Sequence, residues 1–241
     1  SVNETAQTLT INNPALLPQM GTSWDATLDY YFEPVGNFSV GWFQKTIKDF
    51  IVSGVNSGTV ATGATNGFNG EYGGFTILTS SNAGTAYVQG WELSYQQRLT
   101  FLPGPLKGLS FMANYTQLDT HGNFGGTSSL SSGQVAGFIP KTGNVSLAWR
   151  YGRFSSRFLV NHTSAYITSY SAASIARNLY RFERTAVNAG IEYQFHRNAS
   201  ATLDVANPFA VSQRLYRGIP DQMQSTISNF TTITVGLAGR F

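Results

Sequence analysis

The last thirteen residues of the chain, Asn229 to Phe241, read Asn-Phe-Thr-Thr-Ile-Thr-Val-Gly-Leu-Ala-Gly-Arg-Phe. Every second position from Ile233 through Val235 and Leu237 to Phe241 is apolar or glycine, and the side chains between them are small, hydroxylated or cationic. Because side chains on a strand point to opposite faces with a period of two, this alternation predicts a half-buried β-strand. A tilted strand of about ten residues is also long enough to cross a bilayer.

This ending resembles the terminal strand of bacterial outer-membrane barrels, in which alternate apolar residues lead to a C-terminal aromatic residue. In that group of proteins the pattern is the signal that the barrel-assembly machinery reads. The resemblance implies that the barrel-assembly machinery is a partner of this chain. It also implies an assembly signal made of Phe241, Leu237, Val235 and Ile233.

The composition of the 241 residues narrows the class of protein. Charged residues make up 11% and aromatic residues 14%, and there is no cysteine, whereas an ordinary soluble domain has about 25% charged residues. No run of eighteen apolar residues is present, which excludes a membrane helix. A transmembrane barrel needs apolar residues only at alternate positions, so it remains possible. The net charge of +3 has no obvious cluster and does not indicate nucleic-acid binding.

Alternating segments recur along the chain and predict about nine strands. They span 22–32, 38–50, 85–101, 108–119, 139–151, 154–168, 180–196, 199–206 and 229–241. Short connections at 33–37, 102–107, 152–153 and 197–198 alternate with long ones at 51–84, 120–138, 169–179 and 207–228, which read as loops. Short periplasmic turns and long extracellular loops are typical of outer-membrane barrels. We therefore predict an all-β, antiparallel transmembrane β-barrel portion in a Gram-negative outer membrane, with a periplasmic C terminus and membrane lipid around it.

Two further features refine this prediction. Within 38–50 the alternation changes parity after Trp42, which predicts either a bulge or the point where the strand leaves the membrane. Aromatic residues flank the short turns, where they predict a girdle at one membrane interface. These residues are Phe32, Phe38, Phe101, Tyr151, Phe154, Phe195 and Phe241.

The odd number of strands has its own consequence. Single-chain bacterial barrels have an even number of strands, and an open edge is not tolerated in lipid. With Phe241 in the periplasm, nine crossings would place residues 1–21 outside the cell, and no signal peptide precedes Ser1. We therefore expect the C-terminal part of a larger barrel, in which the strand 229–241 keeps one unpaired edge. A closed nine-stranded barrel would contradict this expectation.

Several motifs together resemble TonB-dependent outer-membrane receptors, in the order that the family has them. The family's Asn-Pro-x-Leu-x-Pro loop and its following strand resemble 13–18 and 24–31, although Gln19 stands where the family usually has Glu. The strand, loop and Gly-x-Glu strand that come next resemble 46–51, Asn82-Ala83-Gly84 and Gly90-Trp91-Glu92-Leu93. Ile139-Pro140-Lys141 and the closing Phe241 fit the last strands of the family.

The resemblance implies a barrel of about 22 strands, of which residues 1–241 would form the last nine or so. It implies uptake of a small-molecule ligand such as an iron–siderophore chelate, cobalamin, haem or an oligosaccharide, driven by the TonB–ExbB–ExbD complex. No plug domain or energy-coupling box is recognised in the chain, so TonB–ExbB–ExbD would act through the missing N-terminal part. Nothing in the sequence selects among the ligands.

Two groups of side chains are candidates for a role in binding. One lies on the parity expected to face the lumen and comprises Glu92, Arg98, Arg150, Arg157, Glu192 and Asp204. The other lies in the long connections, where aromatic rings and cations can hold an anionic or aromatic ligand; it comprises Tyr72, Tyr170, Arg177, Arg214, Tyr216 and Arg217. The segment 216–221 ranks first within the second group. Charge pairing in the lumen and packing within the loops are the competing interpretations.

The sequence gives no sign of catalysis or of a cofactor. The three histidines, His121, His162 and His196, are far apart and lack the spacing of metal ligands, and no nucleophile, phosphate loop or catalytic carboxylate pair is recognisable. Two alternatives to active transport stay open, a passive diffusion porin and a secreted all-β binding module such as a lectin. An outer-membrane lipase-type enzyme is the weakest alternative, because it lacks a nucleophile arrangement.

Overall fold

The computed structural model describes residues 1–82, 84–122, 134–171 and 174–239. Its largest unit is a nine-stranded sheet in which every neighbouring pair is antiparallel, in the order β17-β14-β13-β10-β9-β8-β7-β4-β3. The strands are β3 (Met20–Phe32), β4 (Gly36–Lys48), β7 (Ala86–Arg98), β8 (Leu109–Gly122), β9 (Lys141–Tyr151), β10 (Phe154–Thr163), β13 (Arg184–His196), β14 (Ala199–Ala206) and β17 (Thr232–Gly239). These are the nine strands predicted from the sequence, with ends that differ by up to five residues.

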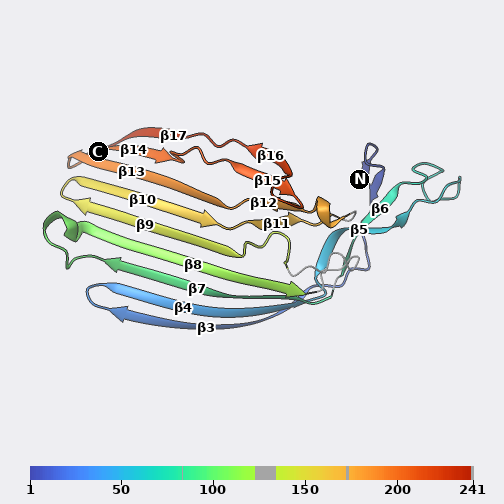
Figure 1. Ribbon diagram of the computed structural model, residues 1–241, viewed down its shortest axis with the longest axis horizontal. Helices are drawn as coiled ribbons and strands as arrows, with labels where there is room; N and C mark the ends of the chain where they lie inside the picture. Colours follow the sequence, from blue (N-terminus) through green and yellow to red (C-terminus); the bar gives the residue numbers. More distant parts are fainter. Residues whose placement is uncertain (83, 123–133, 172–173, 240–241) are drawn as a thin grey trace.

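The strands form a long, curved wall with two different ends (Figure 1). Tight connections join β3 to β4, β9 to β10 and β13 to β14 at one end, and the short 3-10 helix η1 (Gly104–Gly108) lies between β7 and β8 at the same end. The long connections gather at the other end. Within the described residues β17 pairs only with β14 and β3 only with β4, so the sheet is open. The prediction that the last strand keeps an unpaired edge is therefore confirmed.

The register of the nine strands combines their apolar residues into one continuous face. Across β3, β4, β7 and β8, one row of facing residues is Leu28, Val40, Leu93 and Tyr115. Across β9, β10, β13, β14 and β17, another row is Leu147, Phe158, Ala189, Val205 and Ile233. Leu28, Leu93, Leu147, Phe158 and Ile233 of these rows are exposed, with Leu28 at 72% and Ile233 at 65%, and the other four side chains are half-buried. A soluble binding module would cover such a face, whereas a membrane strand presents it to lipid.

Aromatic rings on this apolar face gather next to the tight connections. Phe32 stacks on Tyr95 with ring centroids 5.9 Å apart, and Tyr95 continues the contact to Phe111. Beside the turn between β9 and β10, Phe154 lies 4.6 Å from Tyr193. Phe32 and Phe154 therefore lie where the sequence predicts an aromatic girdle. Phe101 lies in the connection between β7 and β8 instead of in a strand, and Phe241 is outside the described residues.

The prediction that the long connections 51–84 and 207–228 are only loops is wrong, because each supplies two strands to a small four-stranded sheet (Figure 1). The other strands of these two sheets come from the N-terminal segment and from the ends of predicted wall strands. The first has the order β1-β2-β6-β5, with β1 (Val2–Asn3), β2 (Thr8–Thr10), β5 (Ile51–Thr59) and β6 (Thr76–Asn82). The second has the order β11-β12-β15-β16, with β11 (Tyr166–Ser169), β12 (Leu179–Arg181), β15 (Gln213–Arg217) and β16 (Met223–Ile227). A 3-10 helix, η3 (Ile175–Arg177), precedes β12.

The two small sheets carry opposite charge, and we name them accordingly. The acidic sheet is the first one with its connections, residues 1–19 and 49–85, which contain Glu4, Asp49 and Glu71 but no lysine or arginine. The basic sheet is the second one with its connections, residues 166–184 and 213–227. It contains Arg177, Arg181, Arg184, Arg214 and Arg217 against Glu183 and Asp221.

The structure also decides between the two explanations for the parity change in β4. Its pairing with β3 and with β7 runs from Gly36 to Ile47 without a shift in register, so the strand has no bulge. The later half of β4 instead leaves the apolar band, because Ile47 packs against Ala86 and Val135 in a small core near the long connections. No helix of the described residues is long and apolar enough to span a membrane.

Candidate functional site

The charged side chains expected on one face lie together on the side of the nine-stranded sheet opposite the apolar residues, which we name the polar face. Arg150, Ser155 and Glu192 form one row across β9, β10 and β13. In the row beside it, Nη2 of Arg157 lies 2.6 Å from Oδ1 of Asp204. Both side chains are partly exposed, and pairs of this kind contribute about 0.2–1 kcal/mol. Glu92 and Arg98 lie on the same face of β7 and have no ion pair within the described residues.

A glycine makes the Arg157–Asp204 pair possible. These two residues belong to β10 and β14, and Gly190 of the intervening strand β13 faces both of them. A Cβ atom at Gly190 would lie 2.4 Å from Oδ1 of Asp204 and 2.9 Å from Nε of Arg157. Such distances are shorter than real contacts allow, so the pair depends on the missing side chain. Ser155, Glu192 and Thr202 complete a shallow polar hollow around it.

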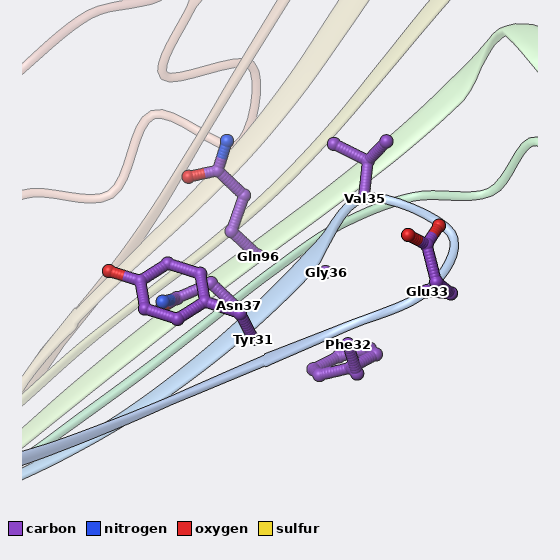
Figure 2. Close-up of a pocket in the computed structure, with 7 residues that line it drawn as sticks. All are labelled: Tyr31, Phe32, Glu33, Val35, Gly36, Asn37 and Gln96. Carbon is purple, nitrogen blue, oxygen red and sulfur yellow. The ribbon is translucent and has the colours of Figure 1, made fainter.

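Two further polar features occupy this face. The amide of Asn144 donates to Oδ1 of Asn114 over 2.7 Å, and the amide of Asn161 donates to Oδ1 of Asn144, which links β8, β9 and β10. Near the turn between β3 and β4, Tyr31, Asn37 and Gln96 lie in one row. Figure 2 shows these three side chains lining a hollow that Glu33 and Val35 of the turn border. Among the described residues, this face thus has a chain of amide hydrogen bonds across three strands and the single ion pair of Arg157 with Asp204.

In the basic sheet, three aromatic rings and one arginine make a continuous run. Tyr180 stacks on Tyr216 with ring centroids 5.1 Å apart and planes at 11°. Phe182 contacts Tyr216 at 4.5 Å, and the guanidinium carbon of Arg214 lies 4.6 Å from the centroid of the Phe182 ring. We name these four residues the aromatic–arginine run. Burial, and to a lesser extent the neighbouring phenol of Tyr180, raise the pKa of Tyr216 above its ordinary value of 10.0.

Only two of the predicted ligand residues, Arg214 and Tyr216, come together in this run. Arg217 is the neighbour of Tyr216 along β15 and points to the other face. Arg177 lies exposed on η3, and the hydroxyl of Tyr170 donates to the main-chain oxygen of Gln134. Tyr72 packs between Phe68 and Phe75 in the acidic sheet. Packing within the loops is thus the structural role of Tyr72.

Sequence reasoning missed the other two members of the run, Tyr180 and Phe182. They fall in a segment assigned to the beginning of a membrane strand, whereas the observed strand β13 begins at Arg184. Tyr180 and Phe182 are two residues apart, as are Arg214 and Tyr216. This shared spacing is the signal by which the sequence could have indicated two paired strands with these side chains on one face. Within the described residues no three His, Asp or Glu side chains gather as a metal site. His121 stacks on Tyr87, and His162 hydrogen-bonds to Thr185.

Hydrogen bonds in the acidic sheet join Asn82 to Leu17, which belong to two of the motifs quoted from the sequence; we call this contact the clamp. The side-chain amide of Asn82 donates to the main-chain oxygen of Leu17 over 2.9 Å, and its Oδ1 accepts from the main-chain nitrogen of Leu17 over 2.8 Å. The same amide donates to the main-chain oxygen of Asp49. Asn82 therefore pairs with the backbone of Leu17 as a strand would, and holds the Pro-containing segment that precedes β3.

Known proteins match this chain at the level of family and fold. The model of the TonB dependent receptor-like β-barrel family matches residues 1–207, and comparison with curated protein sequences gives no match. Among solved structures, the FrpB iron transporter from Neisseria meningitidis is 13% identical with a TM-score of 0.64, covering 97% of this chain and 33% of its own. A mutant of the ferric enterobactin receptor PfeA from Pseudomonas aeruginosa in complex with enterobactin is 18% identical with a TM-score of 0.64, covering 95% and 32%.

A third similar structure is that of the copper transporter OprC, 14% identical with a TM-score of 0.64 over 95% of this chain and 32% of its own. The chain thus spans about one third of the length of each of these proteins. Identities at this level show a shared fold. The match of the family model over most of the chain shows more: the chain belongs to the TonB-dependent receptor-like β-barrel family.

Proposed function

We propose that this chain forms a wall of an outer-membrane receptor that takes up a metal chelate with energy supplied through TonB. The observation that carries the proposal is the nine-stranded sheet with one apolar and one polar face, in a chain that the receptor family model matches over residues 1–207. The family consists of transport receptors of the Gram-negative outer membrane. The similar structures include an iron transporter, a ferric enterobactin receptor and a copper transporter, which supports a metal chelate as the cargo.

In this proposal each part of the chain has a place in the receptor. The polar face, with the six charged residues predicted for it, lines the barrel lumen, and the apolar face meets lipid. The end with tight connections faces the periplasm, and the basic sheet contributes to the ligand surface outside the cell. Contact with TonB–ExbB–ExbD is made by segments N-terminal to this chain in the whole receptor. The barrel-assembly machinery recognises Ile233, Val235, Leu237 and Phe241.

Uptake into cells tests the transport function. A strain that lacks the gene and a complemented strain are compared for accumulation of radioactive iron presented as different chelates. We expect at least one chelate whose uptake needs the gene, and we expect deletion of tonB to remove that uptake to the same extent. Gene-dependent uptake that persists without TonB would identify a passive porin instead.

Two neighbouring residues test which face meets lipid. Leu93 belongs to the apolar face and Ser94 to the polar face. An arginine on the lipid side of a barrel costs about 2–4 kcal/mol near the bilayer midplane, whereas a lumen position tolerates it. We expect Leu93→Arg to reduce the folded receptor in the outer membrane several-fold and Ser94→Arg to leave it nearly unchanged. Equal loss in both variants would contradict the assignment of faces.

A further inference from the structure

The apolar face of the nine-stranded sheet has a hollow to which β4, β7, β8, β9 and β10 contribute, and we name it the lateral hollow. It has a volume of about 340 Å³, and almost all of its lining is apolar. Ala113 of β8 and Gly143 of β9 have the smallest side chains in the two rows that cross it. Larger side chains border them, among them Phe38, Tyr115 and Val160. The lateral hollow is therefore a gap left by two small residues in a face of large ones.

The glycine in this gap is not required by the packing of the sheet. Gly143 lies inside β9, where glycine is less favourable than alanine. An added Cβ atom would lie 3.6 Å from Cδ2 of Tyr115 and 3.7 Å from the main-chain oxygen of Asn114, and both are ordinary contacts. Gly36 on the same face differs, because the ring of Phe32 fills the space beside it. The open space at Gly143 is thus free for a group from outside the chain.

Contacts toward the tight connections hold the ring of Tyr95, which borders the lateral hollow. This ring stacks on Phe32 and contacts Phe111, with centroids 5.9 Å apart in both pairs. Its hydroxyl donates to Oε1 of Gln97 over 2.6 Å. Gln97 and Phe111 are register partners in the row nearer the tight connections. These contacts commit Tyr95 to that row, which leaves the space beside Ala113 open.

A hydrocarbon chain suits this lining better than water does. A water molecule in a cavity needs about two to four polar partners. The polar side chain at the border toward the long connections is already engaged, because Nδ1 of His162 lies 2.9 Å from Oγ1 of Thr185. An empty gap would forfeit dispersion contacts along its walls. The proposed function places lipid on this face, so an acyl chain is the group that can fill the hollow.

A cation lies next to the lateral hollow on the side of the long connections. Lys141 is the first residue of β9 and is exposed, and it lies two residues from Gly143 on the same face of the strand. Among the described residues it forms no ion pair. Asp119 of the neighbouring strand β8 accepts a hydrogen bond from Gln89 and lies near His121. Lys141 can therefore attract the anionic head group of a lipid whose chain lies in the hollow.

We propose that the lateral hollow holds one acyl chain of a phosphate-bearing lipid, whose phosphate meets the ammonium group of Lys141. The hollow supplies the shape and Lys141 the charge, so one lipid is held more tightly than those around the rest of the face. With the long connections outside the cell, this lipid belongs to the outer leaflet. The inference goes beyond transport and uses only one part of the proposed function, the assignment of the apolar face to lipid.

Native mass spectrometry of the full-length receptor in detergent tests this site, with bisphosphorylated lipid A as the probe. We expect the first lipid A to bind about tenfold more tightly than later ones. Ala113→Leu fills the lateral hollow and should weaken binding of the first lipid about tenfold. Gly143→Val fills the same space from β9 and gives a second test if Ala113→Leu fails to fold.

Ala189→Leu is the matched control for filling the hollow. It enlarges an alanine of the same apolar face that lies between Phe158 and Val205, outside the hollow. We expect it to change binding of the first lipid less than about twofold. Equal affinity of the first and later lipids, or unchanged binding in both filling variants, would overturn the inference. A receptor dimer that the filling variants abolish would assign the hollow to a second copy of the chain and would also overturn it.

Lipid A without its phosphates tests the part played by charge. We expect Lys141→Gln to weaken binding of the phosphorylated probe about fivefold and that of the dephosphorylated probe less than about twofold. Lys107→Gln removes the same charge from η1 at the opposite end of the wall and should change neither. An equal loss for both probes in Lys141→Gln would contradict its contact with phosphate. The assay needs neither chelate nor TonB, so failed lipid binding leaves the proposed transport standing, and failed uptake leaves the lipid site standing.

Discussion

The acidic and basic sheets have the same number of strands and lie at the same end of one wall, yet they use their side chains differently. In the acidic sheet, polar groups are satisfied locally. Asn66, for example, donates to the main-chain oxygens of Ala61 and Glu71 and accepts from the main-chain nitrogens of Phe68 and Gly70. Leu9 and Val60 are buried in the same region. The basic sheet instead has arginines next to stacked rings, and none of them forms an ion pair with a carboxylate among the residues that the structure describes.

The difference distinguishes a structural extension from the proposed ligand surface within one protein. A loop that satisfies its own donors and acceptors has little left for a partner, since hydrogen bonds within the loop replace those to solvent or ligand. Like charges without counter-ions repel one another, and a bound ligand of opposite charge relieves this repulsion. Four experiments test this contrast.

Exchanging charge between the sheets should have the largest effect. Arg214→Glu replaces attraction with repulsion at the end of the aromatic–arginine run. We expect it to weaken binding of an anionic probe chelate, the trianionic ferric complex of a synthetic tris(catecholamide), by about 3 kcal/mol, roughly a hundredfold. Glu71→Lys places a new cation in the acidic sheet and should change the affinity less than about threefold. Isothermal titration of the purified receptor measures both, and a comparable effect of the two variants would remove the distinction between the sheets.

Glycines with a positive φ occur in both sheets, but only one of them is crowded. Gly218, after β15, has a φ of 65°, and an added Cβ atom would lie 2.7 Å from the main-chain oxygen of Ala176. Gly74 in the acidic sheet has a φ of 87° and open space around it. We expect Gly74→Ala to cost about 1 kcal/mol and Gly218→Ala about 2–3 kcal/mol, because strain and a backbone clash add.

Hydrogen exchange followed by mass spectrometry measures how far each variant loosens the amides near its own site. Faster exchange should be confined to the region of β12 and β15 in Gly218→Ala. If Gly74→Ala loosens its sheet as much as Gly218→Ala does, the close approach of Gly218 to η3 adds nothing to the cost of the substitution.

Removing the clamp in the acidic sheet should have a somewhat smaller effect. Asn82→Ala deletes one acceptor and two donated hydrogen bonds, which we expect to cost about 2 kcal/mol and to expose the amide of Leu17 to exchange. Asn82→Asp keeps the acceptor for Leu17 and loses only the donors, so its cost should be intermediate. Binding of the trianionic chelate should stay the same in both. A drop in affinity would show that the acidic sheet, too, takes part in the ligand surface.

The smallest effect concerns the phenol of Tyr216, whose pKa is raised by burial and by Tyr180. A raised pKa means that the folded sheet favours the neutral phenol. Its contribution to stability is complete below pH of about 10 and is lost as the pH rises through the higher folded value. In an absorbance titration, the difference between wild type and Tyr216→Phe should therefore appear at a higher pH than that of an ordinary phenol. A difference centred near the ordinary value would contradict the packing of the run.

The nine-stranded wall could be predicted well from the sequence because each of its strands has one apolar face and one polar face. One face of β7 carries Tyr95, Leu93 and Trp91, and the other carries polar groups, so the period of two is visible in the residues themselves. The strands outside the wall were missed because no such demand acts on them. In β5, the pairing with β6 shifts twice, between Val52 and Val55 and between Asn56 and Gly58, and any alternation is lost there.

The residues of the proposed ligand surface could be predicted only in part, for a related reason. Arg214 and Tyr216 are recognisable as a cation and a ring in one loop, but the rings they contact are distant in the chain: Tyr180 in β12 and Phe182 just after it. Arg177 and Arg217 lie in the same long connections, yet neither guanidinium lies over an aromatic ring of the described residues. The residue types suggested aromatic and cationic contacts. Only the pairing of the strands showed which of these residues lie against one another.

The bare backbone at Gly190 has a consequence for how this wall is assembled. If β13 slipped by one residue against its neighbours, Ala189 or Ile191 would take the place between Arg157 and Asp204, and the side chains of β13 would exchange faces. A methyl or butyl group would then stand where the two charges meet, and the side chains of Arg157 and Asp204 would have to move apart. Their contact across three strands thus accompanies the register of β13 that places Gly190 between them.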